Sequence, residues 1–332
     1  MLRPNVRELL KDLSALEVIT ELELFIKNNP KEEFYLANID LLRMYGKSGQ
    51  RDKFYKLALF LTSSINNPAV YREIARFSYF IEKDSQVAQL YASKAIKINA
   101  DEPLWVYYIA RQPKVYFEKL YEGIYLTSIP KNASTSLKSM MLAELHGKTD
   151  VNPHSVFGNP FFKSNQLDLN IEEKDLKLIS TREPLSRFVS YFNKNIIEEG
   201  SLHEELSFTG KSEMYGLPLK PTFDFFVENL NVYCYVFNDV LHHILPQTAY
   251  FNDLSIYDCV ADLSDSYKLG ELVTKRLGLE RPIAPPRKMV SKRKVSELAI
   301  SDSSKKALYR LFSDDINVLT GISSSKNYSF KF

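Results

Sequence analysis

The chain contains 332 residues, of which 45% are hydrophobic, 25% charged and 13% aromatic. This balance is typical of a folded globular protein, and at roughly 150 residues per domain the length predicts about two domains. The 43 basic residues against 41 acidic residues leave a formal charge of +2, which argues against a whole-surface field that drives nonspecific binding to nucleic acid or membrane. Any anion-binding site must therefore be local.

The two cysteines, Cys234 and Cys259, have no neighbouring cysteine or closely spaced histidine, so neither a zinc site nor a disulfide framework is predicted. No window approaches the roughly 18 to 20 apolar residues that span a bilayer. The N-terminal stretch interrupts its apolar residues with charges, unlike a secretory signal. We therefore expect an N-terminal amphipathic helix, no transmembrane segment and a cytoplasmic location.

Residues 1–115 have helical periodicity, with apolar residues three and four positions apart. Polar breaks that end in proline recur at Asn28-Asn29-Pro30, Asn66-Asn67-Pro68 and Asp101-Glu102-Pro103. Between the breaks lie two pairs of helical runs, 33–45 with 52–65 and 69–82 with 85–98. These pairs resemble tetratricopeptide repeats. We expect an all-α domain that offers a surface for a protein partner or for self-association; a helical cap over the second domain is the alternative.

From residue 116 to residue 332 strands alternate with helices. A β-prone run at 121–130 leads through a polar loop into a helix at 136–147, and a strand at 175–180 leads into a helix at 185–196. Strand, loop and helix in this order form the βα unit of a parallel sheet, whose ligands bind at the carboxyl ends of the strands. We therefore predict an α/β domain over 116–332 with a site at both loops.

The first of these loops has the composition of an anion cradle. It consists of Pro130, Lys131, Asn132, Ala133, Ser134, Thr135 and Ser136. Small side chains let backbone N–H groups approach an anion, hydroxyls add donors, the next helix directs its positive end at the loop, and Lys131 supplies a charge. The loop is not a Walker A motif, because it lacks GxxxxGK[ST]. The structural alternative is a Ser/Thr-rich helix cap beside a solvated lysine.

The second loop adds further cations. Arg182 follows the predicted strand, Pro184 suits a first helical turn, and Arg187 and Ser190 lie three positions apart on one helix face. Arg182 beside a helix hydroxyl is suited to hold a second phosphate. In the structural alternative Arg187 pairs with Glu183, and Ser190 is an ordinary helix residue. Two cradles in successive βα units suggest one ligand with two anionic ends.

These motifs resemble those of a known family. PKNASTSL and TREPLSRFVSYFNK are similar to the paired cofactor motifs of the carbohydrate sulfotransferases, the group of chondroitin, dermatan and heparan O-sulfotransferases. Further segments from about residue 119 to residue 325 share the likeness, namely HILPQ, YDCVADLSD, KRLGLERPIAPP and LYRLFSDDINVL. The chain departs from the commoner pattern at Ala133, often Gly or Val in relatives, and lacks their N-terminal membrane anchor. The resemblance implies an α/β fold with a parallel sheet, related to nucleotide kinases.

The resemblance also implies a donor, 3′-phosphoadenosine 5′-phosphosulfate (PAPS), which leaves as the bisphosphate PAP. The loop from Lys131 to Ser136 would hold the 5′-phosphosulfate, and Arg182 with Ser190 would hold the 3′-phosphate. Arg187 would belong to the same cation group around the nucleotide. The loop after the Pro-rich segment at 282–286 would add Ser291 and Arg293.

For the reaction, Lys131 would stabilise the leaving oxygen, and the lack of an acidic cluster near the loop predicts that no metal is needed. By order in the chain, His154 resembles the histidine that activates the acceptor hydroxyl; a solvent-exposed loop histidine is the alternative. Glu144 and Glu204 are fallback bases. His243 and Gln247 would contact a saccharide or glycan acceptor; for His243, support of the fold is the alternative.

Two other functions stay open at this point. The first is an ATP-dependent P-loop-like kinase. This hypothesis is weakened because the chain lacks both GK[ST] and a Walker-B-like acidic strand end. The second is a noncatalytic helical-repeat scaffold with a degenerate transferase domain, which does not explain the intact set of Lys131, Arg182 and Ser190. The basic cluster at 287–294 is interpreted as part of the nucleotide site and not as a nucleic-acid patch, because the whole chain is nearly neutral.

Overall fold

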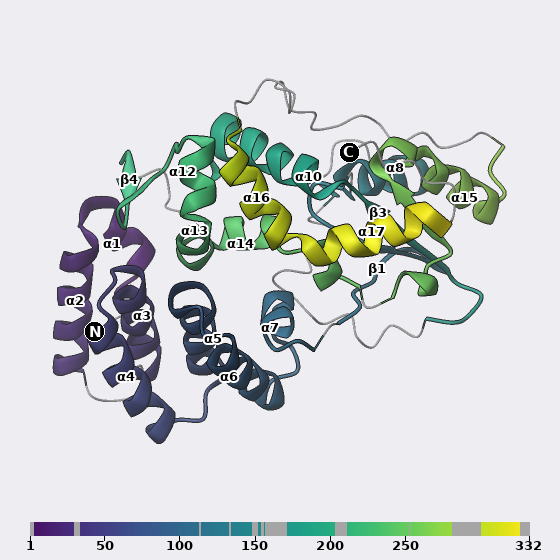
Figure 1. Cartoon of the computed structure of the whole chain (residues 1–332). Helices are drawn as coiled ribbons and strands as arrows, with labels where there is room; N and C mark the ends of the chain where they lie inside the picture. The colour runs from purple at the N-terminus through teal and green to yellow at the C-terminus, as the bar shows by residue number, and fades with distance from the viewer. Residues whose placement is uncertain are drawn as a thin grey trace. The chain divides into compact units, whose positions relative to one another are not determined.

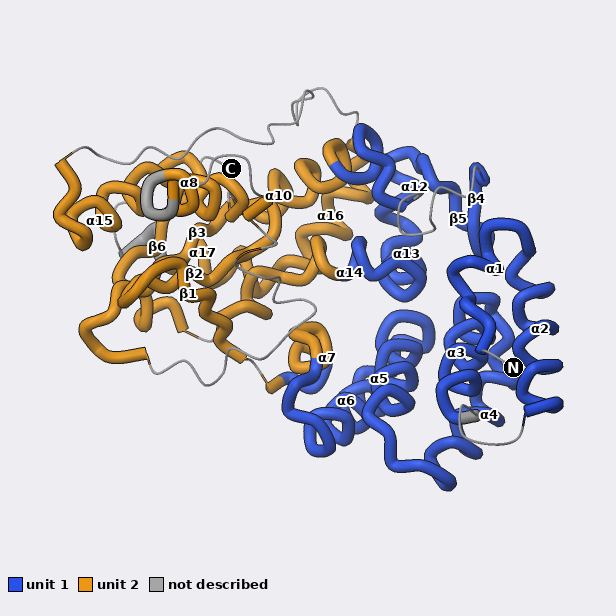
Figure 2. The backbone as a smooth tube through the Cα atoms, turned by 180° about the vertical axis from the view of Figure 1, so that it is seen from behind, with its two compact units in different colours: residues 1–102, 109–111, 195–241 blue, residues 103–108, 112–194, 242–332 orange. Residues whose placement is uncertain are grey.

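The computed structural model describes residues 3–29, 34–112, 114–132, 134–147, 152–153, 156, 171–202, 211–251, 253–280 and 300–325. Its described part is a mixed α/β structure in which many helices precede the first strand (Figure 1). Two compact units can be separated (Figure 2). The first comprises 1–102, 109–111 and 195–241, and the second comprises 103–108, 112–194 and 242–332.

The helices of the N-terminal region start at the residues that favour helix caps. Ser14 and Glu17 form a capping box at the start of one helix, and Asn67 and Asp84 accept N–H bonds at the starts of two others. The helices are α1 (Val6–Asp12), α2 (Ala15–Asn28), α3 (Phe34–Lys47), α4 (Arg51–Ser64), α5 (Pro68–Phe77), α6 (Ser85–Ile98) and α7 (Leu104–Ile109), and the π-helix η1 (Ser78–Glu82) extends α5.

Within the first unit, α3 packs against α4 and α5 packs against α6. The helical runs expected between residues 33 and 98 are therefore confirmed. The tetratricopeptide repeat itself stays a prediction.

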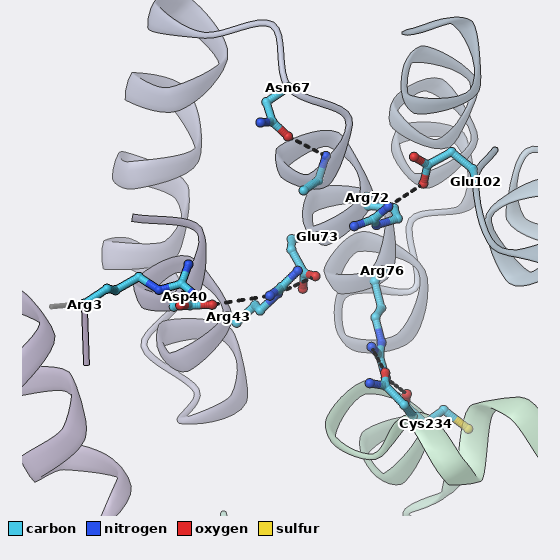
Figure 3. A network of polar contacts seen from close by, with 11 residues as sticks. Arg3, Asp40, Arg43, Asn67, Arg72, Glu73, Arg76, Glu102 and Cys234 are labelled. Carbon is cyan, nitrogen blue, oxygen red and sulfur yellow. Dashed lines mark hydrogen bonds and ion pairs between the residues drawn. The ribbon is translucent and has the colours of Figure 1, made fainter. Parts of the chain in front are cut away.

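Residues 195–241 belong to the first unit although they come from the second half of the chain. They contribute β4 (Glu213–Met214), β5 (Leu217–Pro218), α12 (Phe223–Glu228) and α13 (Leu230–Val236). Figure 3 shows Arg76 of α5 directed at α13, where Nη2 donates to the carbonyl of Cys234 at 2.6 Å. Its Nη1 donates to Asn238 Oδ1, also at 2.6 Å. The expected division into 1–115 and 116–332 stays a prediction; the packing joins 195–241 to the N-terminal helices.

Partly buried ion pairs link residues of the first unit (Figure 3). Arg43 Nε lies 2.7 Å from Glu73 Oε1, Arg43 Nη1 lies 3.4 Å from Asp40 Oδ1, and Arg72 Nη1 lies 2.9 Å from Glu102 Oε2. Burial opposes ionisation of Glu73, but the neighbouring guanidinium groups, led by that of Arg43, hold its pKa below the ordinary value. The Arg43–Glu73 pair therefore joins α3 to α5. The Arg43–Asp40 pair lies within α3, and the Arg72–Glu102 pair joins α5 to the segment between α6 and α7.

The second unit is built around a sheet with the strand order β1-β2-β3-β6. Its strands are β1 (Glu118–Tyr121), β2 (Ile124–Thr127), β3 (Leu176–Thr181) and β6 (Cys259–Asp262). β2, β3 and β6 run parallel, and β1 is antiparallel to β2. The predicted α/β class with a parallel sheet is confirmed, and the relation to nucleotide kinases stays a prediction.

Apolar side chains from the sheet and two helices form the core of this unit. Leu126 of β2 and Leu178 of β3 pack with Met141 of α8 (Ser134–His146) and Leu269 of α15 (Tyr267–Leu277). Both helices therefore cover the same face of the sheet. In the parallel register Thr181 lies opposite Asp262, which brings the carboxyl ends of β3 and β6 to one edge.

Several short helices complete the second unit. α10 (Pro184–Tyr191) follows β3 and continues as the π-helix η2 (Phe192–Glu199), which together with α14 (Asn238–Ile244) extends across the division between the units. The remaining elements are η3 (Gln247–Ala249), η4 (Leu254–Ile256), η5 (Leu263–Asp265), α16 (Asp302–Leu311) and α17 (Ser313–Ser325). Among the described residues no helix combines the length and the apolar character that crossing a bilayer requires.

Candidate active site

The loop after β2 turns through a left-handed residue. Lys131 has a φ of 69°, a conformation that costs a residue with a side chain roughly 1–2 kcal/mol. The N–H of Asn132 donates to the carbonyl of Ile129 at 3.2 Å and closes the turn. Because α8 starts at Ser134, the positive end of its helix dipole lies at the end of this loop.

The side chains of this loop differ in exposure. Asn132, Ser134 and Ser136 are buried, whereas Lys131 and Thr135 are half-buried. The start of α8 thus has the donors and the nearby cation that an anion cradle needs. Ala133 lies outside the described residues.

Arg182 joins the second loop to the first. Its Nη1 donates to the carbonyl of Lys131 at 3.0 Å, and its Nε donates to Ser186 Oγ at 3.1 Å. Among the described residues no carboxylate lies within ion-pair distance of the guanidinium. Desolvation, together with the nearby charge of Arg187, lowers the pKa of Arg182 to about 10, although the charges of Glu183 and Asp262 oppose this shift. A cation so placed favours the binding of an anion.

Arg187 donates to three backbone carbonyls. Its Nε donates to Pro130 at 3.1 Å, and its Nη2 donates to His243 at 2.9 Å and to Leu245 at 2.6 Å. The side chain is 1% exposed, and burial lowers its pKa despite the attraction of Asp315. Arg187 therefore ties the first loop to the segment after α14. The Arg187–Glu183 pairing of the structural alternative is absent from the described ion pairs.

Two buried polar atoms at the strand ends have no hydrogen-bond partner among the described residues. They are Asn132 Oδ1 and Ser180 Oγ. Ser180 lies two residues after Leu178 on β3, and residues two apart in a strand point to the same face. Ser180 therefore shares the sheet face that α8 covers. Unsatisfied buried polar atoms are rare in folded proteins. Their position beside the start of α8 is consistent with a site completed by a polar ligand.

Several of the other predicted site residues lie outside the part of the chain that the structure describes. His154, Ser291, Arg293 and the fallback base Glu204 lie outside the described residues, as does the side chain of Glu144. Ser190 is half-buried in α10. Arg182 contacts the hydroxyl of Ser186 instead. Ser186 is not among the residues predicted from the sequence, although it follows Arg182 by only four positions and is close enough in the chain to be a candidate.

His243 and Gln247, both expected to contact the acceptor, have protein partners. The His243 ring stacks on Tyr191 with centroids 4.6 Å apart. Gln247 is buried, and its amide bonds to Asn132 and to the backbone of Arg182. An acceptor contact for either residue stays a prediction.

The comparison with protein families decides the class of the chain. The model of the sulfotransferase family matches residues 117–320. The chain belongs to the sulfotransferase family. No curated protein and no solved structure matches it.

The matched region of this sulfotransferase begins next to β1 and ends within α17. It includes residues 195–241, which pack with the N-terminal helices, so the family region is not confined to one compact unit. Enzymes of this family transfer a sulfuryl group. As in phosphoryl transfer, such a reaction spreads negative charge over the equatorial oxygens, and fixed donors and cations stabilise that charge. Donors and cations of this kind are present here: the first turn of α8 supplies N–H donors, and Lys131 and Arg182 are cations.

Proposed function

We propose that this sulfotransferase transfers a sulfuryl group from PAPS to a hydroxyl of a carbohydrate or glycan, in line and without a metal. The observation that carries the proposal is the environment of Arg182. Its guanidinium is largely desolvated, lies near a second arginine and bonds to neutral oxygens alone among the described residues. An anionic ligand would add a direct ion pair to this guanidinium.

The residues present suit a nucleotide with two anionic ends. In this proposal the first turn of α8, Lys131 and the hydroxyls of Ser134 and Ser136 hold one end, and Arg182 with Ser186 holds the other. The Arg182–Lys131 bond keeps the two groups adjacent. When bound, PAPS would supply the sulfuryl group that is transferred. Lys131 would then face the oxygen on which negative charge accumulates.

The acceptor class rests on the resemblance of the two loop motifs to those of carbohydrate sulfotransferases. We propose His154 as the general base. Ser190, Ser291 and Arg293 are proposed cofactor contacts. A His154→Ala variant is expected to lose sulfuryl transfer while binding PAP normally, and His203→Ala is the matched control. Near-normal turnover of His154→Ala would reject this assignment.

Ligand-dependent thermal unfolding tests the donor. At a PAP concentration one hundred times the dissociation constant, the stability gain is about 2.7 kcal/mol, so Tm is expected to rise by roughly 5 to 10 °C. Arg182→Ala should lose most of this shift, whereas Arg310→Ala, which alters an exposed arginine of α16, should keep it. Parallel samples contain ATP or ATP with Mg²⁺. Stabilisation by ATP with Mg²⁺ but not by PAP would favour a kinase, and no response to PAP would reject the proposed donor.

Mass spectrometry then tests the transfer. Saccharides incubated with the protein and PAPS are expected to gain a sulfuryl group in the presence of a metal chelator. Loss of the reaction on chelation would contradict metal independence. If PAP binds but only acceptors other than saccharides are modified, the carbohydrate class is wrong.

A further inference from the structure

The carboxylate of Asp315 fixes the backbone at the start of η3. Asp315 lies in the first turn of α17 and is fully buried. Its Oδ2 accepts the N–H of Gln247 at 2.8 Å, and its Oδ1 accepts the N–H of Thr248 at 2.9 Å and the hydroxyl of the same residue at 3.0 Å. Three donors on one buried carboxylate leave the backbone of Gln247 little freedom to rotate.

The side chain of Gln247 then bonds to both loops of the candidate site. Its Nε2 donates to the carbonyl of Arg182 at 2.7 Å, and its Oε1 accepts the N–H of Arg182 at 3.1 Å. The same Oε1 accepts a bond from Asn132 Nδ2 at 2.7 Å. One amide therefore holds the backbone of the second loop in both directions and, at the same time, a side chain of the first loop.

Asn132 completes this set of contacts. Its Nδ2 donates a second bond, to the carbonyl of Ser180 at 3.0 Å. The end of β3 is thus bonded on one side of Thr181 by Asn132 and on the other side by Gln247. All of the residues involved lie in the second unit.

We propose that Gln247, held by Asp315, is a positioning residue that fixes the two anion-binding loops relative to each other. A ligand with two anionic ends requires a constant separation between the groups that bind them. Loops fixed before binding avoid the entropic cost of ordering them during binding. The inference rests on the proposed function for the identity of the ligand. The coupling between the loops, however, can be measured in the unliganded protein.

Hydrogen exchange of the unliganded protein tests the coupling. Gln247→Met keeps the length of the side chain and removes its hydrogen bonds. We expect amide exchange at 128–132 and at 180–183 to become at least about fivefold faster together, with β1 and the N-terminal helices unchanged. Leu22→Ala, a cavity in the core of the first unit, controls for general destabilisation and should leave both loops protected. Exchange that rises in one loop only, or in neither, would overturn the proposal.

Asp315→Asn and Gln247→Glu provide independent tests if Gln247→Met does not fold. Asp315→Asn removes the charge that holds Gln247, so it should loosen both loops. Gln247→Glu keeps an acceptor oxygen in place of Oε1, but its ionised form cannot donate to the Arg182 carbonyl, so it should loosen residues 180–183 more than residues 128–132. If the amides of both loops exchange as slowly in these variants as in the wild type, the proposal is also overturned.

Binding of PAP separates this proposal from the proposed function. If the wild type binds PAP, Gln247→Met should weaken binding at least about fivefold, and Leu22→Ala should not. Unchanged affinity for PAP in Gln247→Met would reject the positioning function. If the wild type does not bind PAP but the loops still loosen together, the coupling stands and the donor assignment fails.

Discussion

The ammonium group of Lys138 lies 2.6 Å from Glu118 Oε2, and both side chains are buried. This pair joins α8 to β1. Ser128, at the start of the first loop, donates its hydroxyl to the same Oε2 at 2.6 Å. Burial raises the pKa of Glu118 and lowers the pKa of Lys138, while each charge opposes the shift of the other. A buried ion pair is often no more stabilising than apolar residues of the same volume, so we interpret this one as setting the position of α8.

Removing one member of this pair is expected to cost more than removing both. Lys138→Met leaves the carboxylate of Glu118 buried without its cation, which should lower the free energy of unfolding by about 3 to 5 kcal/mol. The double variant Lys138→Met with Glu118→Leu should recover most of that loss. Urea unfolding measures both. If the loss of unfolding free energy in the double variant equals the sum of the losses in Lys138→Met and in Glu118→Leu, this interpretation is wrong.

The Lys138→Met variant should also acquire a pH dependence. Without Lys138, the pKa of Glu118 in the folded state rises further above its unfolded value. A carboxyl group with a raised folded pKa stabilises the fold below the unfolded pKa, and this contribution is lost as pH rises through the folded pKa. Relative to wild type, Lys138→Met should therefore lose stability from about pH 4 upward toward neutrality. The double variant, which lacks both groups, should lack this pH dependence.

The main elements could be predicted because their signals are local. Asn67 before Pro68 marks the start of α5, and the β-prone runs that each end in a polar loop and a helix mark β2 and β3. The antiparallel strand β1 is not evident in the sequence, because EKLY is only four residues long and one of its two buried positions is the charged Glu118. Short strands of this kind are too brief to carry a distinct period.

The contacts inside the site could not be predicted, because they join residues that are distant in the chain. Gln247 is the last residue of the HILPQ motif, but no local pattern shows that its amide reaches Asn132 and Arg182. The same holds for Asp315, which follows α16 and resembles any acidic residue in a first helical turn. Local composition identified the two loops, and tertiary packing determines how they are fixed.

Lys131 offers a test that separates charge from backbone strain. Its left-handed conformation is unfavourable for lysine and alanine but not for glycine. We expect Lys131→Gly to be more stable than Lys131→Ala by about 1 kcal/mol, as measured by urea unfolding. Both variants should lose sulfuryl transfer, because neither carries the cation. Equal stability of the two would show that this turn relaxes, and full activity of either would exclude Lys131 from the reaction.

Gly46 should tolerate a side chain only if Tyr235 is changed as well. A Cβ atom at Gly46 would lie 1.9 Å from Tyr235 Oη and 2.9 Å from its Cζ. The hydroxyl is buried without a hydrogen-bond partner among the described residues, so Tyr235→Phe alone should cost little or stabilise. Gly46→Ala alone should lower the free energy of unfolding by about 1 to 3 kcal/mol. The double variant should regain part of this loss; additive effects in a double-mutant cycle would contradict the predicted clash.

Cys234 can report whether residues 195–241 are held by the N-terminal helices in solution. Its thiol is 1% exposed, and burial raises its pKa, so in a Cys259→Ser background it should react with thiol reagents only when this region opens. Arg76→Ala removes the bonds to the Cys234 carbonyl and to Asn238, and we expect the labelling rate to rise at least about tenfold. Arg51→Ala is the matched control, because its ion pair with Glu82 lies in the same unit and its side chain is 61% exposed; exposed pairs of this kind contribute little. Equal labelling rates in Arg76→Ala and the control would show that Arg76 does not hold α13 against α5.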